Sequence, residues 1–165
     1  MNTRLPLHLT LNGEALDTAC DPTTTLAAVL RGEGAKTVRL GCEEGVCGSC
    51  TVLVDGQSQR ACLTLAIQVE GAEVKTVESY ASEPRLRAIQ DAFVAHYAAQ
   101  CGFCTSGMLG VVAEYLDDPC VPNHADEAAI RNRLNAVVCR CTGYQQIVEA
   151  VRALALARKR NGDGR

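Results

Sequence analysis

Ten cysteines constrain this chain more than any other feature of its sequence. The stretch GCEEGVCGSC, residues 41 to 50, contains three of them together with three glycines. The chain begins without a charged segment followed by an apolar core, and it has no twin arginine, so we expect a cytoplasmic protein. In a reducing compartment, clustered cysteines hold metal more often than they form disulfides, which favours a metal role for these thiols.

The charge balance argues against several classes of protein. The chain has 16 basic and 19 acidic residues, which indicates neither a basic field for nucleic acid nor an acidic disordered tail. Its longest apolar runs fall short of the roughly 18 residues that a membrane-spanning helix needs. We therefore expect no nucleic-acid partner and no membrane insertion.

The hydrophobic pattern changes near ESYASEPR, residues 78 to 85. Before this point apolar residues tend to alternate, as in strands, and after it they recur at helical spacing. The expected class is α+β, with a first domain over 1–79, a helical domain over 80–160 and a flexible tail over 161–165.

The first part predicts a short mixed sheet crossed by one helix. Residues 7–17 form two strands with a turn at Asn12-Gly13, and residues 51–62 form a hairpin with a turn at Asp55-Gly56. A helix within 21–34 would be capped by Asp21 or Thr23. Residues 73–79 supply a further strand, and Cys42 to Cys50 fall in a loop at the sheet edge.

The second part predicts four helices beyond Pro84 that pack together, because helices this short are marginal alone. Thr105 or Ser106 would cap the second of them. The expected apolar faces are Leu86, Ile89, Phe93 and Tyr97; then Met108, Val111, Val112, Tyr115 and Leu116; then Ile130, Leu134, Val137 and Val138; and last Ile147, Val151 and Leu154.

Four cysteines follow the plant-type spacing for a [2Fe–2S] cluster: Cys42, Cys47, Cys50 and Cys62. The glycines at 41, 45 and 48 let the backbone turn tightly and direct N–H groups toward the negative charge of the bridging sulfides. A structural zinc site would more often show two separated pairs, each with two residues between the cysteines. The spacing therefore predicts an iron–sulfur cluster.

A second set of four thiols comprises Cys101, Cys104, Cys139 and Cys141. Spacing alone leaves zinc open here, although a single residue between two ligands is unusual for zinc. Arg140 is either a solvated side chain or a charge that raises the reduction potential of a cluster. Cys20 and Cys120 each stand alone and are not expected to be ligands.

Three stretches resemble the iron–sulfur subunit of the molybdenum hydroxylases, the family of xanthine dehydrogenase, aldehyde oxidase and carbon monoxide dehydrogenase. They are GCEEGVCGSCTVLVDGQSQRACLTLA, QCGFCTSGM and CRCTGYQQIVEAV. The resemblance runs from about residue 4 to residue 157. It implies an N-terminal β-grasp ferredoxin domain followed by a four-helix bundle, with one [2Fe–2S] cluster in each.

The resemblance also implies roles for single residues. Cys42, Cys47, Cys50 and Cys62 would bind the cluster nearer the flavin or another outlet, and Cys101, Cys104, Cys139 and Cys141 the cluster nearer the molybdenum. Gln100 would hydrogen-bond the molybdopterin, and the Cys141 sulfur would lie close to the pterin amine. Mo-molybdopterin is expected on a large partner subunit, and FAD on another subunit unless an external acceptor takes the electrons.

Some positions depart from the family pattern. Glu43 stands where many relatives have glycine, Ser49 where many have alanine, and residues 135 to 138 read Asn-Ala-Val-Val. The stretch DDPCVPNHAD is also slightly longer than the usual loop. If Glu43 or Glu44 lies close to the first cluster, its charge would lower the reduction potential, and Glu43→Gln tests this.

The chain carries no pattern for substrate chemistry, such as a G-x-G-x-x-G motif or a P-loop. We expect it to relay electrons one at a time from a molybdenum centre through two clusters to FAD or another acceptor. The alternatives are a free-standing two-cluster ferredoxin and a redox-sensing regulator. Neither explains QCGFCT or the helical domain as well.

Overall fold

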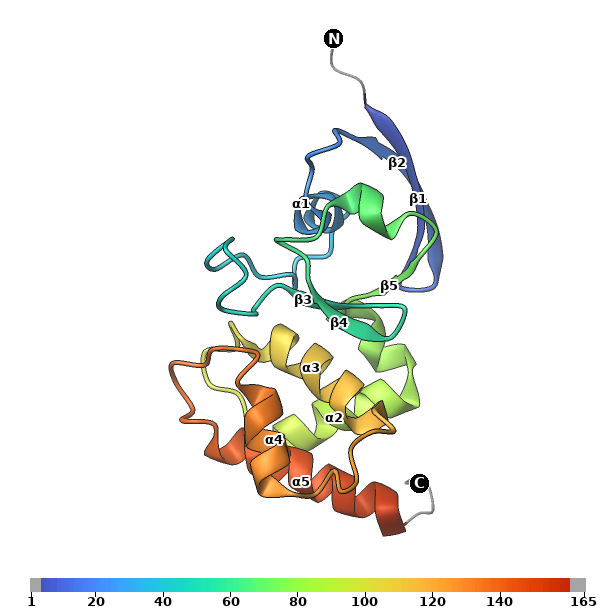
Figure 1. Ribbon diagram of the computed structural model, residues 1–165. Coiled ribbons are helices and arrows are strands. Elements are labelled where there is room, and N and C mark those ends of the chain that lie inside the picture. Colours follow the sequence, from blue (N-terminus) through green and yellow to red (C-terminus); the bar gives the residue numbers. More distant parts are fainter. Residues whose placement is uncertain (1–3, 161–165) are drawn as a thin grey trace.

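A computed structural model of the protein describes residues 4–160, and the expected tail over 161–165 lies outside them. Its first part is a five-stranded mixed sheet (Figure 1). The strands are β1 (Leu5–Leu11), β2 (Glu14–Cys20), β3 (Thr51–Val54), β4 (Gln57–Arg60) and β5 (Glu73–Lys75). They follow the order β2-β1-β5-β3-β4, in which β1 and β5 are parallel and the other pairs antiparallel.

Two tight turns set the register of the hairpins. Asn12 and Gly13 have φ of 55° and 87°, and Asp55 and Gly56 have φ of 49° and 80°. Two consecutive left-handed residues match the twist of the flanking strands, and Asn-Gly and Asp-Gly adopt this turn most readily. Both predicted turns are confirmed.

Helix α1 (Leu26–Gly32) lies across the sheet, but its predicted cap is wrong. Thr25, and neither Asp21 nor Thr23, accepts the hydrogen bond of Ala28 N–H at 3.2 Å. Residues 21–24 instead form a turn in which Thr24 N–H donates to the Asp21 carbonyl at 2.9 Å. That turn leaves Thr25 as the extended residue immediately before the helix.

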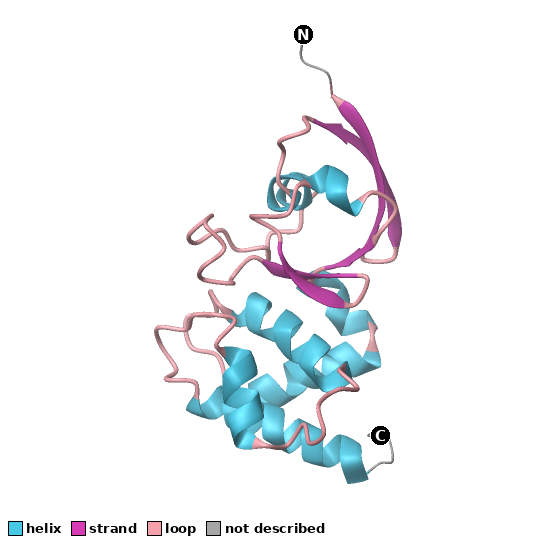
Figure 2. Ribbon diagram, viewed as in Figure 1, coloured by secondary structure: helices cyan, strands magenta, loops and turns pink. Residues whose placement is uncertain are grey.

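Helices make up the second part, as Figure 2 shows. After two 3₁₀ turns, η1 (Ala66–Val69) and η2 (Val77–Ser82), the helices are α2 (Pro84–Ala95), α3 (Thr105–Asp117), α4 (Glu127–Leu134) and α5 (Gln145–Arg160). Helix α2 packs against α3 and α5, and α4 also contacts both α3 and α5. Among residues 4–160, no helix is long and apolar enough to cross a membrane.

Several predicted helix ends need correction. Helix α2 stops at Ala95, so Tyr97 does not extend its apolar face and is 84% exposed with φ of 52°. Helix α4 stops at Leu134, so Val137 is buried in a loop and Val138 is exposed. Helix α3 begins at Thr105 without a side-chain cap. The ends of α2 and α4 and the start of α3 all lie next to the loops that carry the second set of cysteines.

Two hydrophobic cores meet at β3. Val52 and Val54 belong to the core between the sheet and α1, whereas Leu53 belongs to the core of the helices. Helix α3 packs directly against β3 and β4 (Figure 1). All four residues of β3 are therefore buried, and the two parts share a wide contact.

Candidate functional site

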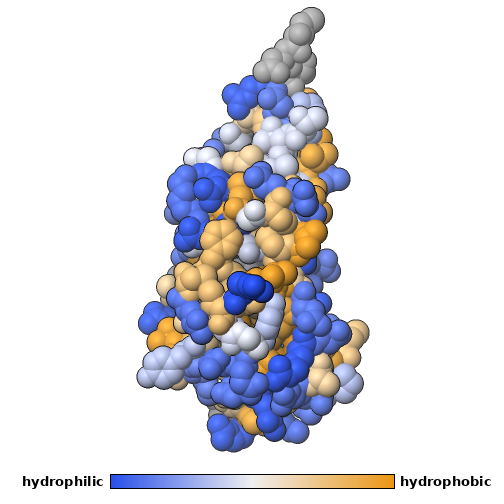
Figure 3. Space-filling model, turned by 90° about the vertical axis from the view of Figure 1, so that its left-hand side faces the viewer, coloured by the Kyte–Doolittle hydropathy of each residue, from blue (hydrophilic) through white to orange (hydrophobic). Residues whose placement is uncertain are grey.

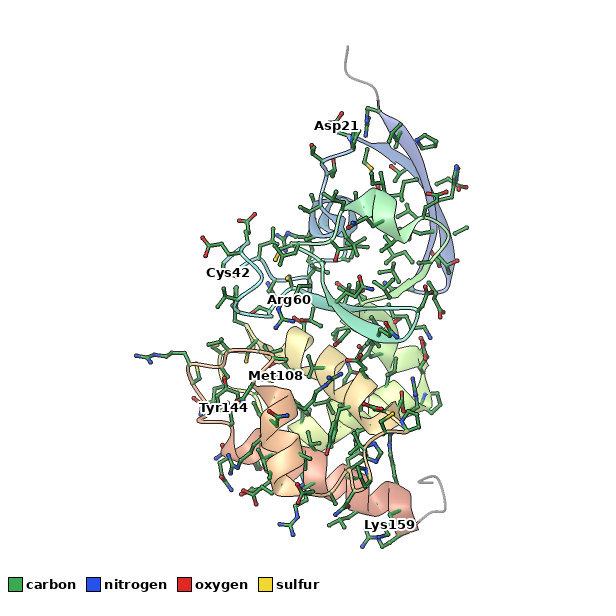
Figure 4. All side chains as sticks on the ribbon, viewed as in Figure 1. Asp21, Cys42, Arg60, Met108, Tyr144 and Lys159 are labelled. Atoms are coloured by element: carbon green, nitrogen blue, oxygen red, sulfur yellow. The ribbon has the colours of Figure 1, made fainter. Side chains whose placement is uncertain are left out.

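The segments that carry the two cysteine sets lie on one side of the molecule. The loop over 41–50 and the loops that precede α3 and α5 are all on the left in Figure 1. Cys42 and Tyr144, from the two sets of loops, mark this side in Figure 4. Residues separated by about one hundred positions are thus brought to one face.

The first set divides into two pairs of thiols. The Cys42 sulfur accepts backbone hydrogen bonds from Cys47 and Glu44, each at 3.4 Å, and these N–H groups lower the pKa of Cys42 to about 7. Burial raises the pKa of Cys50 to about 11, and the adjacent Cys62 thiol contributes to this increase. One pair is thus partly exposed and the other is buried.

The second set divides in the same way. Burial raises the pKa of Cys104 to about 12, and a side-chain hydrogen bond with Cys139 contributes. A hydrogen bond with the Cys101 thiol raises the pKa of Cys141, while the backbone N–H of Phe103 lowers that of Cys101. Cys104 pairs with Cys139, and Cys101 pairs with Cys141.

The donor atoms of each set suit a two-iron core. Each set contributes four cysteine sulfurs. A [2Fe–2S] core has two irons and takes four cysteines, so each iron requires one pair. The donor atoms therefore suit the predicted clusters.

Two of the three glycines of the first loop have the positive φ that the sequence predicted, and Gly41 does not. Gly45 and Gly48 have φ of 74° and 71°, which favours glycine strongly. Glu43 also has a positive φ, 57°, a conformation that favours glycine over residues with a side chain. The side chains of Glu43 and Glu44 are exposed.

Two residues that support the second loop were missed by sequence reasoning. The Tyr144 hydroxyl accepts a hydrogen bond from Cys139 N–H at 2.8 Å and donates one to the Val137 carbonyl at 3.0 Å. Thr142 Oγ1 lies 3.1 Å from the Cys139 sulfur. Although burial acts against it, the Thr142 hydrogen bonds lower the pKa of Cys139. The stretch CRCTGY contained this signal, because it places Thr142 and Tyr144 only a few residues after Cys139 and Cys141.

The structure also places the other four residues that the sequence analysis singled out. Gln100 and Arg140 are exposed, beside the exposed Cys101 and Cys141. Cys20 is buried in β2, and Cys120 is exposed in the loop after α3. That neither of these two is a ligand stays a prediction.

Comparison with known proteins agrees with this geometry. A family model for a [2Fe-2S] binding domain matches residues 76–152, and one for a 2Fe-2S iron-sulfur cluster binding domain matches residues 33–99. Together they cover both cysteine sets.

Relatives and solved structures share most of the chain. The nicotine 6-hydroxylase small subunit of Paenarthrobacter nicotinovorans is 46% identical over 149 residues, which cover 90% of this chain and 88% of the relative. A chain of quinoline 2-oxidoreductase from Pseudomonas putida 86 is 40% identical with a TM-score of 0.83, covering 95% of this chain and 97% of that one. Aldehyde oxidoreductase from Desulfovibrio gigas matches at 35% identity and a TM-score of 0.83 over 96% of this chain, but only 17% of its own.

Proposed function

We propose that this chain, which belongs to the family of iron–sulfur subunits of the molybdenum hydroxylases, relays single electrons between a molybdenum centre on a large partner subunit and an acceptor. The observation that carries the proposal is that the fold gathers two sets of four free cysteines, each set within a segment that matches a [2Fe-2S] binding domain. When bound, two [2Fe–2S] clusters supply one-electron redox chemistry. The chain would hold and orient them through its cysteines, of which Cys50, Cys62 and Cys104 are buried.

The ligands that we assign are the eight cysteines of the two sets. Cys42, Cys47, Cys50 and Cys62 would hold the first cluster, with the buried Cys50 and Cys62 at the open end of the β3–β4 hairpin. Backbone N–H groups directed at Cys42 stabilise its thiolate form, which is the form that binds iron. Cys101, Cys104, Cys139 and Cys141 would hold the second cluster, where Thr142 and Tyr144 support the loop.

The second cluster is proposed to face the molybdenum cofactor. Gln100, Cys101 and Cys141 are exposed together, so a cofactor on a partner subunit can approach them directly. Gln100 has amide groups that can hydrogen-bond a pterin, and the Cys141 sulfur can accept from its amine. The first cluster, on the sheet side, would then pass electrons to FAD on another subunit or to an external acceptor.

The surface around the clusters suits a protein partner. Figure 3 looks at the side that carries the cluster loops and shows apolar residues across its middle, bordered by polar ones. Val46 and Leu63 near the first set are 69% and 59% exposed, and Val138 near the second set is 52% exposed. Apolar patches with polar borders mark interaction sites. This supports a stable complex with the large subunit.

We further propose a β-grasp domain over 1–79 and a four-helix bundle over 80–160. Two separate hydrophobic cores, one on each side of β3, support this division. The described cysteines are all free thiols, which is compatible with the reducing cytoplasm. The substrate class would be set on the large subunit, and the relatives' names place N-heterocycles and aldehydes among the candidates.

Metal analysis of the chain purified from its host, together with its partners, tests the function. We expect about four irons per copy, as two [2Fe–2S] clusters require, with molybdenum and a large subunit in the same fraction. The same iron without molybdenum or a partner would favour a free ferredoxin. Zinc in place of half of the iron would overturn the assignment of the second set.

Two serine variants provide a matched comparison. Cys104→Ser removes a predicted ligand and should lose about half of the iron, because one cluster needs all four cysteines. Cys120→Ser changes an exposed cysteine outside both sets and should keep all of it. Equal iron in the two variants would contradict the ligand assignment.

A further inference from the structure

The two proposed ligand loops are joined by one backbone hydrogen bond. Val138 N–H donates to the Cys47 carbonyl at 2.8 Å. Cys47 is a proposed ligand of the first cluster, and Val138 immediately precedes Cys139, a proposed ligand of the second. A route from one ligand sulfur to the other therefore crosses a single non-covalent link.

The Arg60 side chain also connects the two ligand loops. Its Nε donates to the Gly45 carbonyl at 2.5 Å, and its Nη2 donates to the Ala136 carbonyl at 2.6 Å. Gly45 and Ala136 each lie two residues before the partners of the Cys47–Val138 hydrogen bond. The guanidinium thus donates a hydrogen bond to one carbonyl from each loop. Figure 4 shows Arg60 at the lower edge of the sheet, above the helices.

The loops also approach each other too closely for side chains to intervene. A methyl group at Gly48 would overlap the Ala136 carbonyl oxygen, and one at Gly107 in α3 would overlap the Gly48 carbonyl. A side chain at Gly41 would meet the ring of Phe103. Backbone of the first loop therefore rests directly on the segments that carry the second set of cysteines.

Arginine is suited to this position because its planar guanidinium presents several N–H donors in a fixed geometry. Two donors pointing at two carbonyls fix both the separation and the relative orientation of the loops. A lysine ammonium keeps the charge but behaves as a point on a flexible stem, so it cannot fix both carbonyls in the same way. Arg60 is half-buried, which shields its hydrogen bonds from competition with water.

We propose that Arg60 is a positioning residue for electron transfer between the two clusters, holding the loops so that the Cys47–Val138 hydrogen bond is the main connection. The inference rests on the proposed function. One electron moves at a time, oxidising the cluster that held it and reducing the other, and no bond is made or broken. The residue acts through the two loops, because its hydrogen bonds go to their backbone carbonyls.

Arg60→Lys and Arg60→Met in the purified complex test this inference. Arg152, exposed on α5, provides the control variants Arg152→Lys and Arg152→Met. The readouts are iron per chain, the magnetic interaction between the two reduced clusters in low-temperature electron paramagnetic resonance, and the rate of electron transfer between them. The magnetic interaction depends steeply on the distance between clusters, so it reports position without reference to activity.

We expect both Arg60 variants to weaken the magnetic interaction and slow the transfer several-fold, with Met more affected than Lys. The Arg152 variants should match wild type. Full iron with an unchanged magnetic interaction and transfer rate in both Arg60 variants would overturn the inference. Loss of iron from both variants would also overturn it, because Arg60 would then be needed to keep a cluster bound. If only Arg60→Met loses iron, Arg60→Lys decides by the same criteria.

The two proposals can fail separately. A wild-type complex without about four irons would refute the proposed function itself. A wild-type complex with this iron but no magnetic interaction between its clusters would overturn only the role of Arg60.

Discussion

The hydroxyl of Tyr144 lies 2.8 Å from the backbone nitrogen of Cys139, which donates a hydrogen bond to it. The same hydroxyl donates to the Val137 carbonyl, so one side chain satisfies a donor and an acceptor of the loop that precedes CRC. Tyr144 itself has a φ of 66°. A non-glycine residue in this region persists only where its surroundings stabilise it. The two hydrogen bonds provide that stabilisation.

Tyr144→Phe should therefore destabilise the chain. It leaves the Cys139 N–H and the Val137 carbonyl without their partner, which costs about 1–3 kcal/mol for a group away from water. Tyr97→Phe is the control, because the Tyr97 side chain is exposed and its loss of a hydroxyl should have almost no effect. Urea unfolding of the iron-loaded chain measures both variants, and equal midpoints would contradict the supporting role.

Gly48→Ala tests the close contact between the two loops. The left-handed conformation of Gly48 costs about 1–2 kcal/mol for any other residue, and the overlap with the Ala136 carbonyl adds to this. Gly71→Ala is the matched control, with φ of 76° and no atom near the added methyl group. We expect the thermal midpoint to fall further in Gly48→Ala than in Gly71→Ala. A similar fall in both would mean that the loops separate without cost.

The hairpin turns and the cysteine spacing were predictable because local chemistry determines them. Asn-Gly and Asp-Gly adopt the left-handed pair whatever surrounds them. The glycines at 45 and 48 stand between cysteines whose spacing already required a tight loop.

Features that depend on distant residues were not predictable in this way. Strand β3 was expected to alternate, but α3 covers its second face, so Leu53 joins the helical core. Val137 and Val138 continue an apolar pattern at helical spacing, yet the chain leaves α4 at Leu134. Val138 N–H instead donates a hydrogen bond to the Cys47 carbonyl, ninety-one residues away in sequence. No local sequence pattern predicts that partner.

Glu114→Ala should loosen the junction between the sheet and the helices. Ser58 in β4 donates to the Glu114 carboxylate at 2.5 Å, and Arg133 in α4 forms an ion pair with the same oxygen. Removing the carboxylate leaves a half-buried guanidinium unpaired, and we expect a loss of about 1–3 kcal/mol in unfolding free energy. Asp91→Ala breaks an exposed pair with Arg87 within α2 and should cost at most about 0.5 kcal/mol. Equal losses in urea unfolding would refute the distinction.

Glu78→Gln tests the hydrogen-bonded contact between η2 and Thr37, which lies in the segment that leads into the first loop. The Glu78 carboxylate accepts a hydrogen bond from Thr37 N–H at 2.9 Å and another from the Thr37 hydroxyl. Burial opposes the shift by raising the pKa of Glu78, but the Thr37 and Thr76 hydrogen bonds prevail and lower it below 4.5. The carboxylate therefore favours the folded chain at neutral pH.

The sign of the pH dependence follows from this direction. A carboxyl group whose pKa is lower in the folded state stabilises the fold fully above its unfolded pKa, near 4.5 here. That contribution is lost as the pH falls through the lowered folded pKa. Glu78 is itself exposed, so solvent screens its interactions, and wild type should exceed Glu78→Gln in stability by at most about 0.5 kcal/mol at pH 7. The difference should shrink below about pH 4.5. The exposed Glu33 provides the control Glu33→Gln. Urea unfolding midpoints are measured across this pH range. If they fall in parallel for wild type and both variants, the stabilising role of the Glu78–Thr37 contact is contradicted.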